Sequence, residues 1–242
     1  MSDSNRDSVE PPPRLVPPRA NRVWLLAAAC LLLLLAVPSY LVARRLLAFH
    51  RAASTALPPQ EVTIIASFRA DFRPEQPAPG WRYCWNENGP VGDTNGYVPL
   101  VWTGERYAPT DMPLPAPPPA NYLRLSNRSG HPGQGPSQRS ANGSDDECAV
   151  IIGFTVPEAG RYAITDSFIS RHDGAMNGSV HLQVFVNDRD TTAEVYCRSR
   201  EGIPFNRELG YLAAGDSIYV SIGAGETDKN DSFGLDFSIS HF

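Results

Sequence analysis

The chain carries a stripe of aromatic side chains that could bind a sugar. Trp81, Tyr83 and Trp85 occupy every second position of the segment GWRYCWN, residues 80–86, and therefore share one face of a predicted strand. Aromatic rings stack on the apolar faces of sugars, but each ring also buries about 150–250 Å² when it packs in a core. The segment predicts either a ligand-stacking platform or a part of the hydrophobic core, and the sequence leaves both open.

A second set of polar and aromatic side chains lies on predicted strands nearer the C-terminus. In HLQVFVN and SIYVSIG the apolar residues occupy alternate positions and predict a buried face. The opposite face would carry the candidate ligand-binding residues His181, Gln183, Tyr196, Arg198 and Tyr219. Such a face could hydrogen-bond sugar hydroxyls and stack on sugar rings. The alternative is a solvated face, or one that the N-terminal half of the domain covers.

Acidic side chains near the C-terminus could bind calcium. The stretch GETDKNDSFG supplies Asp228, Asn230 and Asp231, and Asp236 follows on the next predicted strand. Calcium takes about six to eight oxygen ligands, mostly carboxylates and carbonyls. These four residues are therefore the candidate ligands of a structural calcium ion. Ordinary loop acids are the alternative, because the stretch lacks the glycine position and the closing glutamate of an EF-hand.

No arrangement of residues in the sequence predicts catalysis. The chain has no GxSxG elbow, no HExxH helix and no phosphate-binding glycine loop. The candidate acid–base groups are His131 in GHPG and His172 beside Asp173, and both positions are typical of surface histidines. We therefore predict no catalytic residue and a non-enzymatic function.

The four cysteines are spread widely along the chain, at Cys30, Cys84, Cys148 and Cys197. None of them forms a CxxC or another zinc-ligand spacing. The three that follow residue 60 allow one disulfide with one thiol left over, or three separate buried thiols.

An uncharged apolar run at residues 23–43, VWLLAAACLLLLLAVPSYLVA, divides the chain. About 20 such residues span the hydrocarbon core of a bilayer as a helix. The run is longer than a signal-peptide core and no convincing cleavage site follows it, so we predict a retained transmembrane helix. Helical composition continues to about residue 56.

The flanking segments indicate how the chain is oriented. Residues 1–22 are rich in Pro and Arg and predict a disordered cytoplasmic tail. The arginines before and after the apolar run are nearly balanced, so the positive-inside rule decides little. Residues 61–242 are rich in Gly, Asn and Ser and poor in Lys, which favours a periplasmic or extracellular location. Four N-x-S sequons agree with an exposed surface there: Asn127, Asn142, Asn177 and Asn230.

Residues 61–242 predict an all-β domain. Short apolar segments alternate with polar residues and are separated by turn signals every 10–20 residues or so, which is typical of an antiparallel sandwich or barrel. The predicted strands lie at 62–68, 80–86, 97–102, 121–126, 149–156, 161–169, 181–187, 193–199, 217–223 and 233–239.

The order of several motifs resembles a known class of domain. FTVPEAGRYAITDSF, HLQVFVND, LAAGDSIYVSIG and DSFGLDFSI follow one another as in the jelly-roll sandwiches of carbohydrate-binding modules and galactose-binding-like domains. The resemblance covers residues 62–242 and rests on turn glycines and alternating apolar residues. It implies a jelly-roll fold, with glycan binding and a structural calcium as properties of such domains.

These observations together predict a single-pass membrane protein with a non-catalytic binding module outside the cytoplasm, most simply for carbohydrate. The net charge of −5 gives no basic footprint, so nucleic acid is excluded as an expected partner. The alternative is a structural or assembly subunit that docks on a protein partner through the sandwich and the membrane helix. A surface hydrolase would need two carboxylates about 5–10 Å apart in a cleft, which the sequence does not suggest.

Overall fold

The computed structural model describes residues 62–87, 89–110, 116–140, 146–172 and 178–242. All of these residues belong to one compact unit, Gln60–Phe242. The predicted tail and transmembrane helix lie outside the described residues. Within those residues, no helix has the length and apolar character needed to cross a bilayer.

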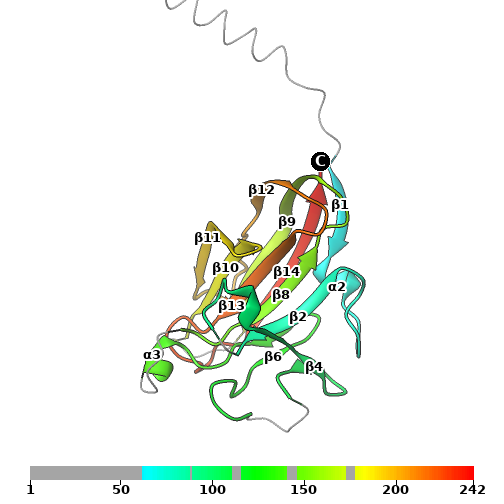
Figure 1. Cartoon of the computed structure of the whole chain (residues 1–242). Helices are drawn as coiled ribbons and strands as arrows, with labels where there is room; N and C mark the ends of the chain where they lie inside the picture. Colours follow the sequence, from blue (N-terminus) through cyan, green and yellow to red (C-terminus); the bar gives the residue numbers. More distant parts are fainter. Residues whose placement is uncertain (1–61, 88, 111–115, 141–145, 173–177) are drawn as a thin grey trace, which may run out of the picture. The chain divides into compact units, whose positions relative to one another are not determined.

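The prediction of an all-β domain is confirmed, because the described residues form two antiparallel sheets (Figure 1). Sheet A has the strand order β12-β9-β14-β7-β6-β5-β4, and β1 pairs with β14 beside this path. Its strands are β1 (Thr63–Ser67), β4 (Val101–Trp102), β5 (Tyr107–Ala108), β6 (Arg124–Leu125), β7 (Ser129–His131), β9 (Gly160–Arg171), β12 (Arg207–Leu212) and β14 (Phe233–His241).

Sheet B has the strand order β11-β10-β13-β8-β2-β3. Its strands are β2 (Trp81–Asn86), β3 (Tyr97–Pro99), β8 (Val150–Thr155), β10 (Val180–Val186), β11 (Arg189–Cys197) and β13 (Ser217–Gly223). In the described part of the domain, three short helical turns lie between strands: α2 (Phe68–Asp71), η1 (Thr94–Gly96) and α3 (Pro136–Arg139).

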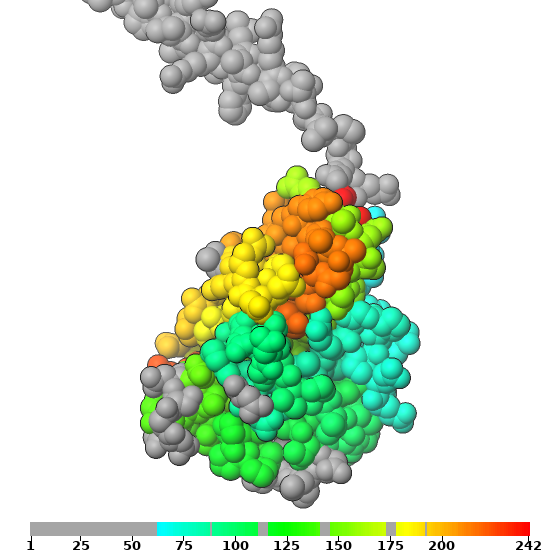
Figure 2. All heavy atoms as spheres, in the orientation of Figure 1, coloured from blue at the N-terminus to red at the C-terminus, as the bar shows by residue number. Residues whose placement is uncertain are grey.

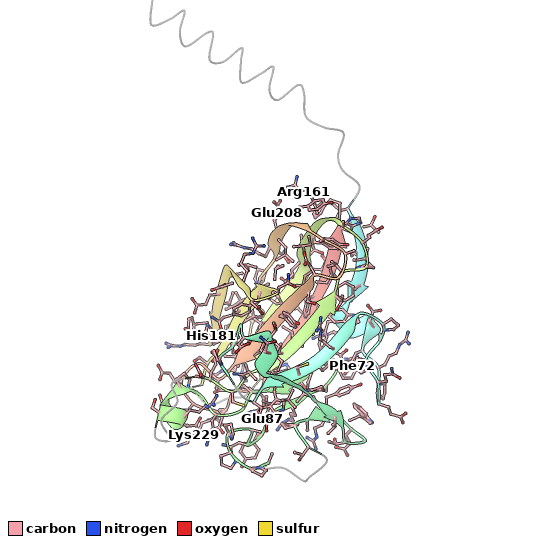
Figure 3. The ribbon with its side chains drawn as sticks, viewed as in Figure 1. Phe72, Glu87, Arg161, His181, Glu208 and Lys229 are labelled. Carbon is pink, nitrogen blue, oxygen red and sulfur yellow. The ribbon has the colours of Figure 1, made fainter. Side chains whose placement is uncertain are left out.

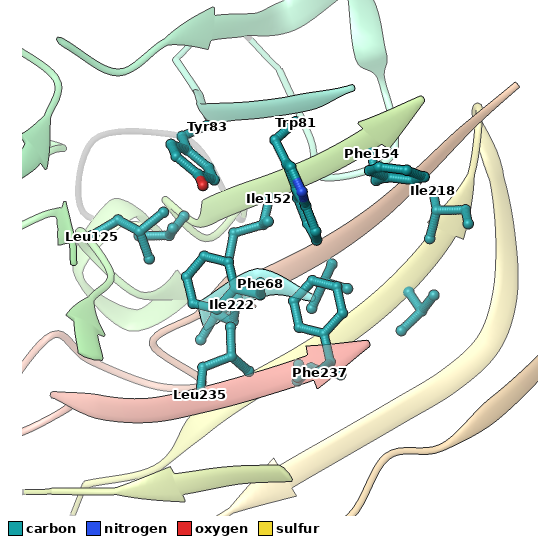
Figure 4. Packing of buried hydrophobic residues seen from close by; sticks show 14 of the residues in the cluster. Phe68, Trp81, Tyr83, Leu125, Ile152, Phe154, Ile218, Ile222, Leu235 and Phe237 are labelled. Carbon is teal, nitrogen blue, oxygen red and sulfur yellow. The ribbon is translucent and has the colours of Figure 1, made fainter. Parts of the chain in front are cut away.

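The core lies between the two sheets in a sandwich-like arrangement (Figure 4). Alternation along β13 and β14 directs Ile218 and Ile222 from one sheet toward Leu235 and Phe237 from the other, because successive side chains of a strand point to opposite faces. The helical turn α2 inserts Phe68 into this layer. The Phe68 ring is fully buried and stacks on Phe237 at a centroid distance of 5.7 Å.

The aromatic stripe on β2 belongs to this core rather than to a ligand platform. Trp81, Tyr83 and Trp85 are only 6%, 2% and 5% exposed. The ring of Trp81 packs on Phe154 of β8 at 5.1 Å, and Tyr83 lies edge-on to Tyr107 of β5 at 4.9 Å. Because the three rings are almost fully buried in the cluster between the sheets, the structure supports the interpretation of the stripe as core.

The outer face of sheet B is only partly open to solvent. A second apolar cluster of Cys84, Ala149, Ile151, Phe185 and Tyr219 lies on this face, and Val91 and Tyr97 from the segment after β2 pack over it. As a result, Tyr219 is only 4% exposed. The N-terminal half of the domain therefore covers the β2–β8–β13 side of the face and Phe185 of β10, whereas Tyr196 of β11 stays exposed.

The three described cysteines are separate buried thiols, so the disulfide alternative does not hold for them. Burial raises the pKa of the Cys84 thiol to about 11 and that of Cys148 to about 12, and it also raises the pKa of Cys197. At neutral pH these groups are protonated and behave as small apolar side chains.

Strand β14 runs from one end of the domain to the other. Its first residue, Phe233, pairs with Gly130 of β7, and His241 near its end pairs with Thr63 of β1, where the described chain begins. At about 3.3 Å per residue these points lie roughly 26 Å apart. Figure 2 shows the chain around β4 to β7, in green, gathered at the end of the domain away from the C-terminal residues, in red.

Candidate functional site

An open groove of about 720 Å³ lies at the β6–β7 end of the domain. Two segments far apart in sequence form it: the run from β6 to β7 with the residues just before it, and the turn between β13 and β14. Its lining is polar apart from one tyrosine ring and consists of Asn121, Tyr122, Arg124, His131, Asp228, Lys229, Asn230 and Ser232.

Tyr122 and Arg124 face the groove because of the alternation in NYLRLS. Leu123 and Leu125 are fully buried in the core, so the residues between and before them point to the other side. Tyr122 is 44% exposed, and its ring meets the His131 ring edge-on at 5.8 Å. The tyrosine therefore presents an aromatic surface whose orientation a neighbouring ring supports.

One wall of the groove is fixed by a hydrogen-bond network around Asp228. The Asp228 carboxylate accepts a hydrogen bond from Asn121 Nδ2 at 2.6 Å and another from Gln138 Nε2. Gln138 Oε1 in turn accepts from the backbone N–H of Asp228 at 2.7 Å and from that of Gly135 at 3.0 Å. This network ties α3, the β13–β14 turn and the residue before Tyr122 together, so Asp228 acts as a structural link in the wall.

The helical turn α3 packs closely on the same β13–β14 turn. The backbone N–H of Ser137 donates to Glu226 O at 3.1 Å, and Ser137 Oγ donates to Glu226 Oε2 at 2.8 Å. Gly135 permits this approach, because a Cβ atom there would overlap the backbone of Glu226. The groove wall is therefore held by main-chain packing as well as by side chains.

The groove combines one exposed aromatic ring with several polar side chains. Tyr122 offers a ring for stacking, and Asn230 and Ser232 add an amide and a hydroxyl group to the lining. Among the described lining residues Asp228 is the one carboxylate, and its hydrogen bonds occupy it. The two-carboxylate arrangement that most glycoside hydrolases use is not present among these residues.

The accessible part of the sheet B face carries a charged cluster around His181. His181 Nδ1 lies 2.8 Å from Glu147 Oε1, and His181 Nε2 lies 2.7 Å from Glu194 Oε1. A neutral imidazole has one N–H, so donation to both carboxylates requires the protonated ring. The Tyr196 ring stacks on the His181 ring at 4.3 Å with an interplanar angle of 2°.

The pKa of His181 reflects two opposing effects. Burial lowers the pKa, but the hydrogen bonds and negative charges of Glu147 and Glu194 outweigh burial and raise it above its ordinary value. Glu147 itself is 7% exposed, and its Oε2 atom is buried without a hydrogen-bond partner among the described residues. The cluster therefore anchors the start of β8 to β10 and β11 through a buried charge pair.

The predicted ligand-binding residues thus do share one face of sheet B, but most of them contact other side chains of the domain. His181, Gln183, Tyr196 and Tyr219 do lie on the outer side of sheet B, and Arg198 is exposed immediately after β11. His181 is engaged by two glutamates, and the Arg82 guanidinium lies over the Tyr219 ring at 5.0 Å. A cavity of about 320 Å³ next to Tyr219 also has Trp81, Tyr83 and Tyr97 in its wall. Tyr196, 56% exposed, is the one aromatic of the predicted set that is open to solvent.

The four residues expected to bind calcium do not form one ligand set. Asp228 is held by Asn121 and Gln138, and the Asp236 carboxylate on β14 lies 3.6 Å from Arg69. Asp231 is fully buried beside Gly178, and the Arg171 guanidinium approaches the same glycine.

A positive charge thus lies near the buried Asp231 carboxylate, because both side chains lie against Gly178. Across the part of the chain that the structure describes, no group of three or more His, Cys, Asp or Glu side chains is placed to hold a metal ion.

Tyr122 is the functional candidate that reasoning from the sequence did not place in a site. The alternation in NYLRLS could have indicated it: if Leu123 and Leu125 point into the core, Tyr122 points away from it. Asp228 and Asn230 were selected for a metal site and His131 for acid–base chemistry, whereas the structure brings all three together with Tyr122 in one groove.

Comparison with known proteins adds little to this geometry. No protein-family model and no curated protein matches the chain. Among solved structures, the Agl-KA catalytic domain is similar to 40% of this chain at 15% sequence identity, with a TM-score of 0.24. The chain covers 21% of that domain's length. A likeness of this size identifies neither a fold nor a function.

Proposed function

We propose that this chain is a membrane-anchored, non-catalytic module that binds carbohydrate outside the cytoplasm in the groove around Tyr122. The observation that carries the proposal is an exposed tyrosine ring in a groove of about 720 Å³ whose other walls are hydrogen-bonding side chains. Ligand sites in proteins usually measure about 300–1,000 Å³, so the groove has room for a short oligosaccharide.

The strand arrangement supports a jelly-roll module as the scaffold. From β8 onward the chain alternates between the sheets: β8 in sheet B, β9 in sheet A, β10 and β11 in sheet B, then β12, β13 and β14 in alternation. Consecutive strands that change sheet are typical of double-sheet jelly rolls. This pattern agrees with the resemblance to carbohydrate-binding modules in the sequence.

The position of the groove also suits a tethered binding module. The N-terminal segment joins the domain at β1, which pairs with the last residues of β14. The groove lies at the first residues of β14, roughly 26 Å away along that strand. The groove and the strand at which the described chain begins are therefore at opposite ends of β14.

The test is a glycan array probed with the intact chain purified in detergent. Tyr122→Ala should reduce binding of the retained glycans roughly tenfold or more, as removal of a central aromatic anchor usually does. Tyr211→Ala is the matched control, because Tyr211 on β12 is 72% exposed and does not line the groove. Binding that Tyr122→Ala leaves intact would contradict the proposal, as would a folded chain that retains no glycan.

One observation favours the second function, docking on a protein partner in a membrane complex. Strand β1 pairs only with β14 among the described strands, and Val62 and Ile64 beside its open edge are 52% and 53% exposed. An open edge with apolar side chains can pair with a strand of another chain. If the alternative holds, Ile64→Lys should reduce the size of the native complex in detergent, whereas Tyr122→Ala should not.

A further inference from the structure

We propose a second binding site in this domain: the cavity of about 320 Å³ beside strand β2 binds a small aromatic carboxylate, whose negative charge Arg82 receives. This site is separate from the groove of the proposed function, because no described residue lines both. Figure 3 shows Phe72, whose ring stacks on that of Tyr83 in the cavity wall, and Lys229 of the groove on different sides of the domain. Each site can therefore be tested without the other.

The cavity lies beside the part of β2 that β3 does not cover. Strand β3 pairs with β2 from Cys84 to Asn86, and before Cys84 that edge of β2 has no partner among the described strands. The rings of Tyr97 and Tyr219 meet edge-on in the cavity wall at 5.4 Å, and Leu100 adds an aliphatic surface. A volume of about 300 Å³ is at the small end of the range for ligand sites, so the cavity has room for one ring with a short acidic arm.

Arg82 is the one charged side chain among the described residues that line the cavity. It is partly exposed and forms no ion pair with any residue that the structure describes. Its Nη2 atom donates to Thr155 Oγ1 at 2.9 Å and to Ser217 Oγ, whereas Nε and Nη1 donate to no described residue. Because a guanidinium stays protonated in proteins, a carboxylate in the cavity would supply the counter-charge that the described part of the domain does not provide.

A second arginine of the same domain shows the contrast. The Arg69 guanidinium lies over the Phe168 ring at 4.8 Å, much as that of Arg82 lies over the Tyr219 ring at 5.0 Å. Arg69 also has a carboxylate of its own, since its Nε atom lies 3.6 Å from Asp236 Oδ2. Of these two stacked arginines, the one without a carboxylate partner is the one that lines a cavity.

A glycine fixes the position of Arg82. In the register of sheet B, Gly153 of β8 lies between Arg82 of β2 and Tyr219 of β13. A Cβ atom on Gly153 would lie 2.7 Å from Arg82 Cγ and 2.9 Å from Tyr219 Cε1. Glycine therefore lets the arginine side chain cross β8 and reach the tyrosine ring. The cation is held in place before a ligand arrives, which reduces the entropy cost of binding.

The experiment compares aromatic acids with their primary amides, which differ in charge but hardly in shape. The intact chain in detergent is titrated calorimetrically with phenylacetate, hydroxycinnamate and indoleacetate, and with the amide of each. We expect at least one acid to bind roughly 5- to 30-fold more tightly than its amide, as one charge-assisted hydrogen bond provides. A tetrapeptide that ends in phenylalanine, with a free or an amidated C-terminus, distinguishes a free acid from the end of a peptide chain.

The matched variants locate the effect in the cavity. Arg82→Gln should remove at least roughly fivefold of the preference for the acid. Arg69→Gln removes the other stacked arginine, which does not line the cavity, and should leave the preference unchanged. Thr94→Phe adds a ring at the cavity wall, leaves Arg82 in place and should weaken the acid and the amide alike by roughly tenfold. Denaturation of each variant without ligand shows which of them keep the fold, and Thr94→Phe provides a test that does not depend on Arg82→Gln folding.

Equal binding of each acid and its amide would overturn the inference, as would a preference that Arg82→Gln and Arg69→Gln reduce equally. A folded chain that binds none of the acids would also overturn it, and Arg82 would then serve only to link β2 to Thr155 and Ser217. Acid binding that Thr94→Phe leaves intact would contradict the cavity as the site. None of these outcomes bears on the groove around Tyr122, which the glycan array tests.

Discussion

Replacing Gly223 by alanine should break the contact between Glu147 and His181. Gly223 lies on β13 opposite His181 on β10, and a Cβ atom on Gly223 would overlap the Glu147 carboxylate. The overlapping atoms belong to the end of the glutamate side chain, so Glu147 must rotate away from the sheet. His181 would then keep only Glu194, whose side chain is 50% exposed.

The expected loss in free energy of unfolding is about 2 kcal/mol. A hydrogen bond between charged groups contributes about 1.5–3 kcal/mol, and the His181 and Glu147 side chains are only 11% and 8% exposed. Replacing glycine by alanine also restricts the unfolded chain, which stabilises the fold by about 0.4–1 kcal/mol. In a Glu147→Ala background the obstacle is gone, so Gly223→Ala should there be neutral or stabilising by up to about 1 kcal/mol.

The assay is guanidinium denaturation of four intact chains, followed by the fluorescence of the core tryptophans. The chains are the wild type, Gly223→Ala, Glu147→Ala and the double variant, which together form a double-mutant cycle. We expect a coupling energy of about 2 kcal/mol between the two positions. An equal destabilisation by Gly223→Ala in both backgrounds would refute the reasoning, because the methyl group would then clash with something other than Glu147.

Three further predictions follow from buried polar groups. Asn86→Ala should lower the free energy of unfolding by about 3 kcal/mol, because the buried amide donates hydrogen bonds to the Glu147 and Gly89 carbonyls and accepts one from the Ala149 N–H. Asn95 is exposed, so Asn95→Ala should change it by less than about 0.5 kcal/mol in the same denaturation assay. The raised pKa of His181 means that its stabilisation is complete below the unfolded value near 6.5 and is lost as pH rises through the folded value. The free energy of unfolding measured by denaturation should therefore be lower at pH 9 than at pH 6, and His181→Gln should reduce this difference. An unchanged difference in that variant would contradict the assignment. Iodoacetamide at pH 7.5 should leave three thiols unmodified in the folded chain and modify them in guanidinium, as peptide mass spectrometry would show for Cys84, Cys148 and Cys197.

The longer strands could be predicted from the sequence because each has one face in a single core. Period-two alternation in SIYVSIG and FGLDFSI identified β13 and β14 and the residues that point inward, such as Ile218 and Phe237. The strands β5, β6 and β7 have only two or three residues, and their pairing partners define them rather than any local pattern. Two or three residues are too few for a period-two pattern to be recognised in the sequence.

Alternation shows which residues share a face but not what covers that face. The stripe of Trp81 and Trp85 was identified as one face of a strand, yet only the second sheet decides that this face is the core. Similarly, Tyr219 was assigned to the outer face of sheet B, where Tyr97, the first residue of β3, packs against it.

The groove could not be predicted from the sequence, because its two walls come from distant segments. Tyr122 and Lys229 are 107 positions apart in the sequence, and they come together because β7 pairs with the first residues of β14. The same holds for the charge pair of His181 with Glu147, which depends on the packing of residue 147 against a glycine of β13. Contacts of this kind depend on strand order, and composition or spacing does not determine strand order.

The measurement that tests the central claim most directly is a titration of the strongest array-binding glycan into three intact chains: the wild type, Tyr122→Ala and Tyr196→Ala. Both tyrosines are exposed, at 44% and 56%, but one lines the groove and the other lies on the outer face of sheet B. We predict that Tyr122→Ala weakens binding roughly tenfold or more, while Tyr196→Ala stays within about twofold of the wild type. The reverse result would place the ligand on the sheet face and contradict the groove as the binding site.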